Sequence, residues 1–214
     1  MALSLSKGGS DYFHILRKAR TTVMTIALAA FLLLQAGSGT PVIDNEFVRV
    51  FKNSAPCAAP GPLCAERVIV ALGAIQLGGQ KMERGAIKVF KTGERYAPPS
   101  GGEYVEVAWK PNRPRATPPP ASIEPEKNSI VYDGERYYVF NELLQPGDTR
   151  PRHSHSQRVV VRLNQTRLQQ WPDGAPEVFR DQVPDSISFN EPAVHIVKNV
   201  GAKPLHNIVI ELKP

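Results

Sequence analysis

Short apolar segments separated by turn residues dominate the chain from residue 41 onward. Eight segments are rich in β-branched or aromatic residues, and clusters of Gly, Pro, Asn or Asp separate them. They are Glu46–Phe51, Arg67–Leu72, Ala86–Phe90, Tyr104–Trp109, Tyr137–Leu144, Arg158–Leu163, Ala193–Val200 and Asn207–Leu212. No segment in this part sustains a helical period over three turns, and the 20 prolines of the chain favour short strands. The pattern predicts an all-β fold.

The segments also repeat at an offset of 91 residues. RVIVALGAIQL, starting at Arg67, aligns without a gap with RVVVRLNQTRL, starting at Arg158, and the same offset places Tyr104 on His195. A supersecondary plan that occurs twice predicts two modules, and chance similarity between short β segments is the alternative. The expected organisation is a first module at 41–112, a stiff Pro-rich linker at 113–128 and a second module at 129–214.

The first 38 residues have the pattern of a secretory signal peptide. Arg17, Lys18 and Arg20 precede the 12-residue apolar run Val23–Leu34, and small residues follow it. Because this run is shorter than the ~20 residues that span a bilayer, we expect no stable membrane span after cleavage. An uncleaved anchor or a buried first helix is the alternative. The pattern predicts a periplasmic or secreted protein.

The charge balance argues against a nucleic-acid partner. The formal net charge is +6, but four basic residues and one aspartate of the predicted leader account for three of these charges. A mature chain of about +3 has an ordinary surface, and no basic run interleaved with aromatic residues occurs in it.

The chain has two cysteines, Cys57 and Cys64, in the stretch CAAPGPLC. In an oxidising compartment the Pro-Gly-Pro bend between them would allow a disulfide that closes a short loop. Two reduced cysteines are the alternative. A metal site built from cysteine alone is not expected, since two ligands do not complete one.

Three histidines form the strongest chemical pattern. His153 and His155 are two residues apart, so on a strand both imidazoles point to the same face. His195, in another predicted strand, would supply a third nitrogen ligand, whereas nothing singles out His206. Three imidazoles on one side suit a divalent transition metal that keeps open positions.

This stretch resembles the first cupin motif, which runs Gly, five residues, His-x-His and then a Glu. Gly147 followed by DTRPR and His153-Ser154-His155 fits the opening of that motif. The second cupin motif keeps a His and an Asn four residues apart, as His195 and Asn199 are here. The resemblance implies two jelly-roll β-barrel modules in tandem, of which the second binds a divalent metal through the three histidines. It also implies a homodimer, since cupins commonly pair through sheet edges.

The sequence departs from the cupin motifs at several positions. The motif glutamate would fall at Val159 or Val160, and Pro192 replaces a glycine. In the first module the offset places Pro62, Cys64 and Tyr104 at the positions of the three histidines. The resemblance therefore implies a site of three histidines and a degenerate first module with a structural role.

Six further residues are candidates for the pocket around the histidines: Gln157, Arg150, Arg152, Tyr138, Phe140 and Asn190. Gln157 has the strand parity of the histidines. The two arginines flank the histidine pair and would attract a carboxylate or phenolate, with solvated charges on an exposed turn as the alternative. Core packing explains the aromatic residues equally well.

Three functions fit these features. The first is a metal-dependent enzyme of the dioxygenase type that acts on a small organic molecule, which the resemblance implies by analogy of fold. The second is a non-catalytic binding or sensing module of the cell envelope, with a small ligand or a metal. The third is a structural domain whose histidines are residual. Among the metals, Fe, Mn, Zn, Ni and Cu all suit imidazole ligands.

Overall fold

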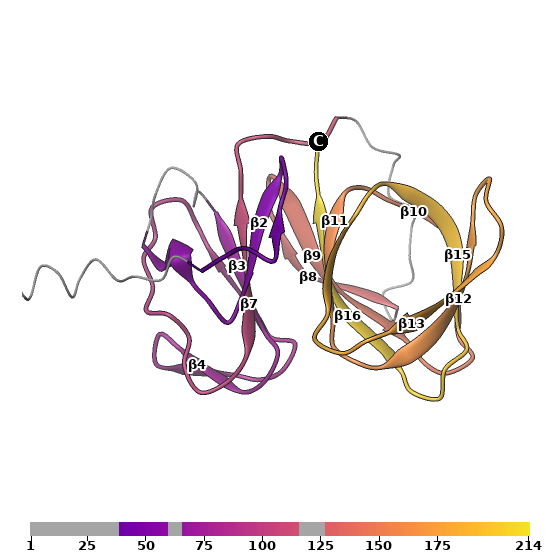
Figure 1. Ribbon diagram of the computed structural model, residues 1–214, viewed down its shortest axis with the longest axis horizontal. Helices are drawn as coiled ribbons and strands as arrows, with labels where there is room; N and C mark the ends of the chain where they lie inside the picture. The colour runs from indigo at the N-terminus through magenta and orange to yellow at the C-terminus, as the bar shows by residue number, and fades with distance from the viewer. Residues whose placement is uncertain (1–38, 60–65, 116–126) are drawn as a thin grey trace, which may run out of the picture. The chain divides into compact units, whose positions relative to one another are not determined.

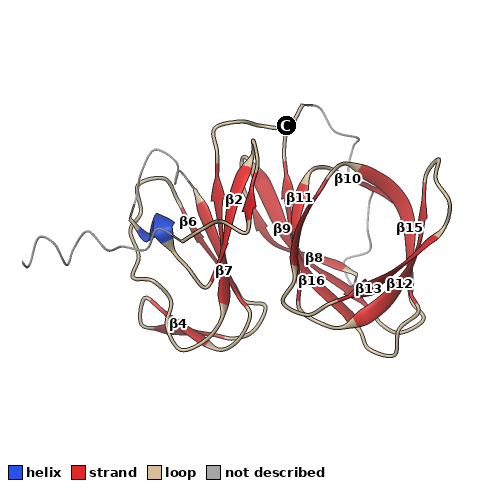
Figure 2. Ribbon diagram, in the orientation of Figure 1, coloured by secondary structure: helices blue, strands red, loops and turns tan. Residues whose placement is uncertain are grey.

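The computed structural model describes residues 39–59, 66–115 and 127–214. The predicted signal peptide, Cys64 and most of the Pro-rich linker lie outside these ranges. Within them nearly all regular structure is antiparallel β-sheet (Figure 2), and the one helical element is a short 3-10 turn, η1 (Pro56–Ala58). None of the described residues form a helix with the length and apolar character of a membrane span.

The first module contains seven strands. Five of them form one sheet in the order β1-β2-β7-β3-β6, and β4 and β5 form a separate hairpin. The bounds are β1 (Ile43–Asp44), β2 (Val48–Lys52), β3 (Arg67–Ala71), β4 (Ile75–Leu77), β5 (Gln80–Met82), β6 (Ile87–Phe90) and β7 (Tyr104–Trp109).

The second module contains nine strands in two sheets. One sheet has the order β14-β11-β16-β9-β8 and the other has the order β10-β15-β12-β13. In Figure 1 the strands of these sheets curve around a common interior, which is the jelly-roll arrangement. The bounds are β8 (Asn128–Asp133), β9 (Tyr137–Leu144), β10 (Thr149–His155), β11 (Arg158–Arg162), β12 (Thr166–Pro172), β13 (Val178–Gln182), β14 (Ile187–Asn190), β15 (Ala193–Asn199) and β16 (Leu205–Leu212). The predicted fold class, an all-β chain with two jelly-roll modules in tandem, is confirmed.

The two five-stranded sheets are equivalent, strand for strand. β7 pairs with β2 and β3, as β16 pairs with β9 and β11. Tyr104 pairs with Ala71, and Asn207 pairs with Arg162, the residue that the offset of 91 assigns to Ala71. Tyr104 is therefore equivalent to Asn207, and its alignment with His195 is wrong. The offset does not hold beyond β11 because the connections from β3 to β7 and from β11 to β16 differ in length.

The largest hydrophobic core lies between these two sheets. It combines side chains of β2, β3 and β7 with side chains of β9, β11 and β16. On β11 the residues alternate: Val159 and Val161 belong to this core, whereas Val160 belongs to a cluster inside the second module. Each fully buried valine contributes ~1.5–3 kcal/mol relative to an exposed one. The first module therefore stabilises the outer face of the sheet whose inner face lines the second module.

Candidate metal centre and its cavity

Two neighbouring strands bring the three histidines together. His153 and His155 lie on β10, and His195 lies opposite His153 on β15. The pairing of these strands is irregular between Arg150 and His153. Because side chains alternate along a strand, both imidazoles of β10 point into the module, where the imidazole of β15 meets them. The first module has no counterpart of this four-stranded sheet among its described residues, and so no place for equivalent ligands.

The three imidazoles converge through their Nε2 atoms. Nε2 of His153 lies 3.1 Å from Nε2 of His155 and 3.1 Å from Nε2 of His195. The ligand atoms of the three residues all lie within 4.8 Å of one another. The side chains are buried, with residue exposures of 2%, 4% and 8%. A metal bound at ~2.1 Å from each nitrogen needs separations of this size.

Hydrogen bonds at the other ring nitrogens fix which atoms carry protons. Nδ1 of His153 lies 2.7 Å from the carbonyl oxygen of Pro151, which only accepts, so this Nδ1 donates. Nδ1 of His155 lies 2.8 Å from a carboxylate oxygen of Glu211 and donates to it. A neutral imidazole has one N–H, so both Nε2 atoms present lone pairs to each other at 3.1 Å. A cation between them relieves this contact, and the three histidines therefore fit a metal.

The electrostatics of the site keep these imidazoles neutral. Burial lowers the pKa of His153 to about 4 and that of His195 to about 3, and nearby positive charge adds to both effects. Burial also lowers the pKa of His155 well below its usual value, and Arg158 contributes to this shift. Neutral imidazole is the form that binds metals, so the ligands are ready at neutral pH.

The two arginines near the histidine pair have different environments. Arg150 is fully buried, and its guanidinium pairs with the carboxylate of Glu142. Burial raises the pKa of Glu142, but the charge of Arg150 and other groups outweighs it and lowers the pKa to about 2. Arg152 is exposed and forms a bidentate pair with Asp173 on the outside. Neither arginine lines the cavity beside the histidines, which differs from the prediction.

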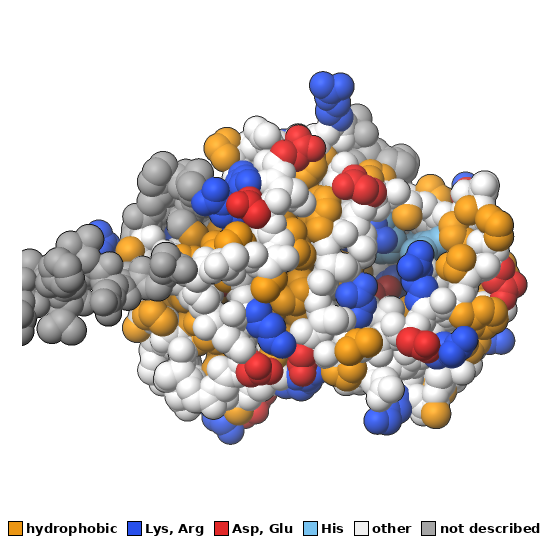
Figure 3. Space-filling view, in the orientation of Figure 1, with side chains coloured by type: hydrophobic (Ala, Val, Ile, Leu, Met, Phe, Trp, Pro, Cys, Tyr) orange, Lys and Arg blue, Asp and Glu red, His pale blue; other side chains and the backbone are white. Residues whose placement is uncertain are grey.

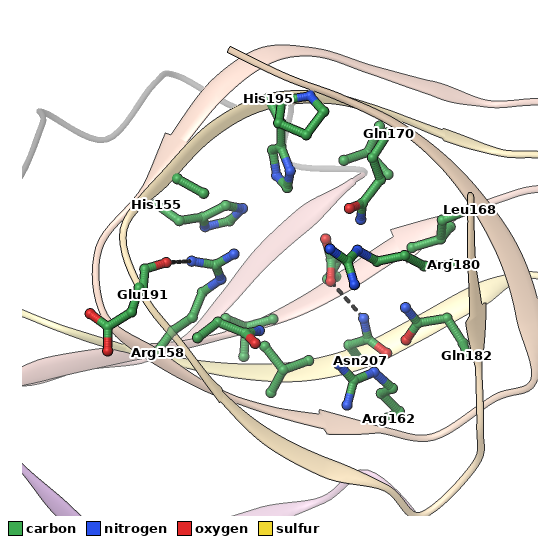
Figure 4. A pocket seen from close by; sticks show the side chains of 17 residues that line it. His155, Arg158, Arg162, Leu168, Gln170, Arg180, Gln182, Glu191, His195 and Asn207 are labelled. Carbon is green, nitrogen blue, oxygen red and sulfur yellow. Dashed lines mark hydrogen bonds between the residues drawn. The ribbon is translucent and has the colours of Figure 1, made fainter. Parts of the chain in front are cut away.

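A cavity of about 330 Å³ occupies the interior of the second module next to the histidines. Figure 4 shows His155 and His195 on one side of it and Arg162, Gln182 and Asn207 on the other. In Figure 3 histidine side chains are visible from outside in an opening between arginine or lysine side chains. The lining residues are Glu142, His155, Arg158, Val160, Arg162, Leu168, Gln170, Pro172, Arg180, Gln182, Asn190, Glu191, Ala193, His195, Val197, Asn207 and Val209.

Among the other predicted pocket residues, Asn190 lines the cavity and Gln157 does not. The amide of Gln157 donates to Glu191 instead, and Arg158 takes the inward position. The reason is that β10 ends at His155 and β11 begins at Arg158, so strand parity is not carried across the turn. Tyr138 and Phe140 point into the module without lining the cavity, and the ring of Phe140 stacks on His155 at 6.4 Å.

Several site residues escaped the sequence prediction. Glu211 holds His155 through its carboxylate, and its other oxygen accepts the N–H of Ser156 at 2.7 Å. Arg162 and Arg180 reach the cavity from β11 and β13. The alternation Arg158, Val160, Arg162 could have signalled one polar face on β11, but no strand was predicted around Arg180.

Cys57 is buried in the first module and is disulfide-bonded. Its backbone N–H donates to the buried carboxylate of Glu106. Cys64, the other cysteine of the chain, lies outside the described residues.

Comparison with known proteins gives matches in structure but not in sequence. No protein-family model and no curated protein matches the chain. The cupin 2 conserved barrel domain protein from Leptotrichia buccalis is 10% identical over 86% of this chain and 94% of its own, with a TM-score of 0.50. AerE from Microcystis aeruginosa is 12% identical over 82% of this chain and 97% of its own, with a TM-score of 0.46. A cupin domain from Bordetella pertussis is 21% identical over 47% of this chain and 100% of its own, with a TM-score of 0.38.

Proposed function

We propose that this chain, which has the cupin fold, is a metal-dependent enzyme that acts on a small organic molecule inside its second module. The observation that carries the proposal is the convergence of three buried Nε2 atoms at one end of the cavity. His153, His155 and His195 would hold the metal. A buried, concave site with a few converging polar groups is also the usual form of a small-molecule site.

His153, His155 and His195 would leave open positions on a divalent transition metal, which would supply Lewis-acid chemistry to a substrate in the cavity. The chain itself supplies the orientation of the ligands: Pro151 fixes the ring of His153, and Glu211 fixes the ring of His155. The reaction class we propose is dioxygenation, in which both oxygen atoms enter the substrate and no further reductant is consumed.

We also propose that the protein is exported to the periplasm or secreted. The basic flank and short apolar run of the first 38 residues support export. The disulfide at Cys57 supports an oxidising destination. Fractionation of cells that express the full chain, with detection of the protein outside the cytoplasm, tests this proposal. A protein found only in the cytoplasm, at its full length, would contradict it.

Metal analysis tests the metal site. We expect about one equivalent of a divalent transition metal in the purified protein, or on titration of the metal-free protein. The variant H155A should lose this binding, whereas H206A should retain it. His206 is a suitable control because its ring interacts with Asn141 and lies outside the three-histidine cluster. If the wild-type protein neither contains nor binds metal, the proposed function is refuted.

Oxygen uptake separates catalysis from binding alone. The metal-loaded protein is incubated with a panel of small organic substrates, and H155A serves as the control. We expect at least one substrate to give oxygen consumption that depends on His155. If metal binds with the expected stoichiometry but oxygen uptake never exceeds that of H155A, the dioxygenase proposal fails and a binding or sensing module is favoured.

A further inference from the structure

Three arginines line the cavity of the second module, and Arg158 donates to the backbone carbonyls of Ser156 and Glu191. The other two, Arg162 and Arg180, form no ion pair with a carboxylate within the described residues. Arg162 donates to the hydroxyl oxygens of Ser188 at 2.9 Å and Ser186 at 3.5 Å, which are both neutral. The side chain of Arg180 makes no hydrogen bond or ion pair within the described residues. Both guanidiniums line the same cavity, and in Figure 4 that of Arg180 extends toward its middle. The two positive charges act on each other, and neither forms an ion pair with a carboxylate, so together they favour an anion.

The acidic residues near this pair are engaged elsewhere. Glu142 is held by Arg150 and by the side-chain amide of Asn207, which donates to it at 2.7 Å. Asp181 lies beside Arg180 in sequence but pairs with Arg167 on β12. Glu142 also lines the cavity and its charge acts on Arg162, but it is shared with Arg150. Glu191, the other carboxylate of the lining, is exposed and accepts from the amide of Gln157.

Two buried amides lie beside the arginines and have unused hydrogen-bonding atoms. Gln182 and Asn207 are 6% and 3% exposed, and both line the cavity. Oε1 of Gln182 and Oδ1 of Asn207 have no partner within the described residues. A buried polar atom without a partner is unfavourable by ~1–3 kcal/mol, so a ligand that donates hydrogen bonds to these two oxygens is stabilised. This observation points to a ligand independently of the charges.

The arginine pair lies away from the histidines. Arg158, whose charge affects His155, is four residues before Arg162 on the same face of β11. With a rise of ~3.3 Å per residue, their Cα atoms are about 13 Å apart. A small molecule anchored at Arg162 can therefore extend along the cavity toward the three imidazoles.

We propose that the substrate is a small organic acid whose carboxylate binds between Arg162 and Arg180, while its other end lies at the histidines. The side-chain oxygens of Gln182 and Asn207 accept hydrogen bonds from a donor group, such as a hydroxyl, next to the carboxylate. This inference rests on the proposed function for the identity of the ligand as a substrate, but the anion site can be tested without the metal. Arg162 and Arg180 are then specificity-determining residues.

Calorimetry on the metal-free full chain tests the anion site, with succinate and glutarate as carboxylate probes. Succinamide is the neutral control, and inorganic phosphate represents the other common oxyanion. Measurements are made at low ionic strength, where contacts between charges are least screened. We expect the carboxylates to bind and succinamide not to bind. The variants R162Q and R180Q should each weaken carboxylate binding about ten- to hundredfold, since each removes a charged hydrogen-bond donor.

R167Q is the matched control, because Arg167 is on the neighbouring strand β12, is exposed and does not line the cavity. It should bind the probes as the wild type does. Because Arg180 is exposed, R180Q should fold normally, and its melting curve confirms this. Unchanged carboxylate affinity in R180Q, or binding of phosphate alone, would overturn the proposal.

The outcome also separates this inference from the proposed function. Both variants should keep the metal stoichiometry of the wild type, because their substitutions leave the histidines intact. If metal binds but carboxylates do not, the anion site fails while the metal site stands. If carboxylates bind in an arginine-dependent way but no metal binds, the anion site stands and the enzyme proposal fails.

Discussion

Replacement of Glu211 by glutamine should weaken metal binding although Glu211 is not a ligand. Its carboxylate accepts the N–H of Ser156 at 2.7 Å and the Nδ1–H of His155 at 2.8 Å, and Tyr138 also hydrogen-bonds to it. A glutamine offers one accepting oxygen and one donating NH₂ group. In E211Q either the N–H of Ser156 or the Nδ1–H of His155 must therefore face the NH₂ group of the glutamine.

One arrangement of the glutamine places a hydrogen-bond donor against His155. If its oxygen serves Ser156, the NH₂ group faces Nδ1 of His155 and favours the tautomer with the proton on Nε2. That proton then occupies the direction in which a metal would bind. Loss of such an outer partner typically reduces metal affinity about 10–100-fold, which corresponds to ~1.4–2.8 kcal/mol.

The assay is competition between metal-free protein and a chelator of known affinity, for the wild type, E211Q and E191Q. Glu191 is exposed at the rim of the cavity, so E191Q removes a nearby charge and leaves the histidines untouched. The increase in thermal stability on metal binding gives an independent measure of the same affinity. If E211Q binds metal as tightly as E191Q does, the reasoning from the tautomers is refuted.

Three further results follow from the packing. Arg150→Met leaves the buried charge of Glu142 without its ion-pair partner and should lower the free energy of unfolding by ~3–5 kcal/mol, as measured by denaturant titration. A loss under ~1 kcal/mol would show that the pair is not buried in solution. The pKa of Glu142 is lowered from 4.5 to about 2, so ionised Glu142 contributes ~3 kcal/mol to the free energy of unfolding above pH 4.5, and this is lost as the pH falls toward 2. E142Q should flatten this part of the profile of stability against pH, and an unchanged profile would contradict the reasoning. Val159→Ala should lower the free energy of unfolding by ~2 kcal/mol, as measured by urea, whereas the exposed Val183→Ala should change it by less than ~0.5 kcal/mol.

The sequence was sufficient for the fold class and for the three histidines. The reason is local: strand alternation puts His153 and His155 on one face, and the structure pairs His153 with His195 across two strands. The eight predicted strand segments all overlap strands of the structure. Strands with irregular or polar patterns were missed, including β12 and β13, which carry Gln170, Arg180 and Gln182.

The surroundings of the histidines depend on contacts that a linear pattern does not encode. Arg150 was predicted beside the pocket, with a solvated charge on an exposed turn as the alternative, and only the structure shows that it is buried and paired with Glu142. Glu211 is 56 residues from its partner His155, so no local spacing links them. Likewise, the turn between β10 and β11 directs the side chain of Arg158, and not that of Gln157, into the cavity. The residue types at these two positions do not predict this change.

The alternation of β11 and β16 connects the first module to the site of the second. On β16, Asn207 and Val209 line the cavity and Glu211 holds His155, while Ile208 and Ile210 belong to the core shared with the first module. A shift of this strand by one residue would exchange the two faces, and would expose the apolar side chains to the cavity. The packing of the first module therefore fixes the register that places Glu211 behind the histidine. This gives a module without ligand residues of its own a direct part in the geometry of the metal site.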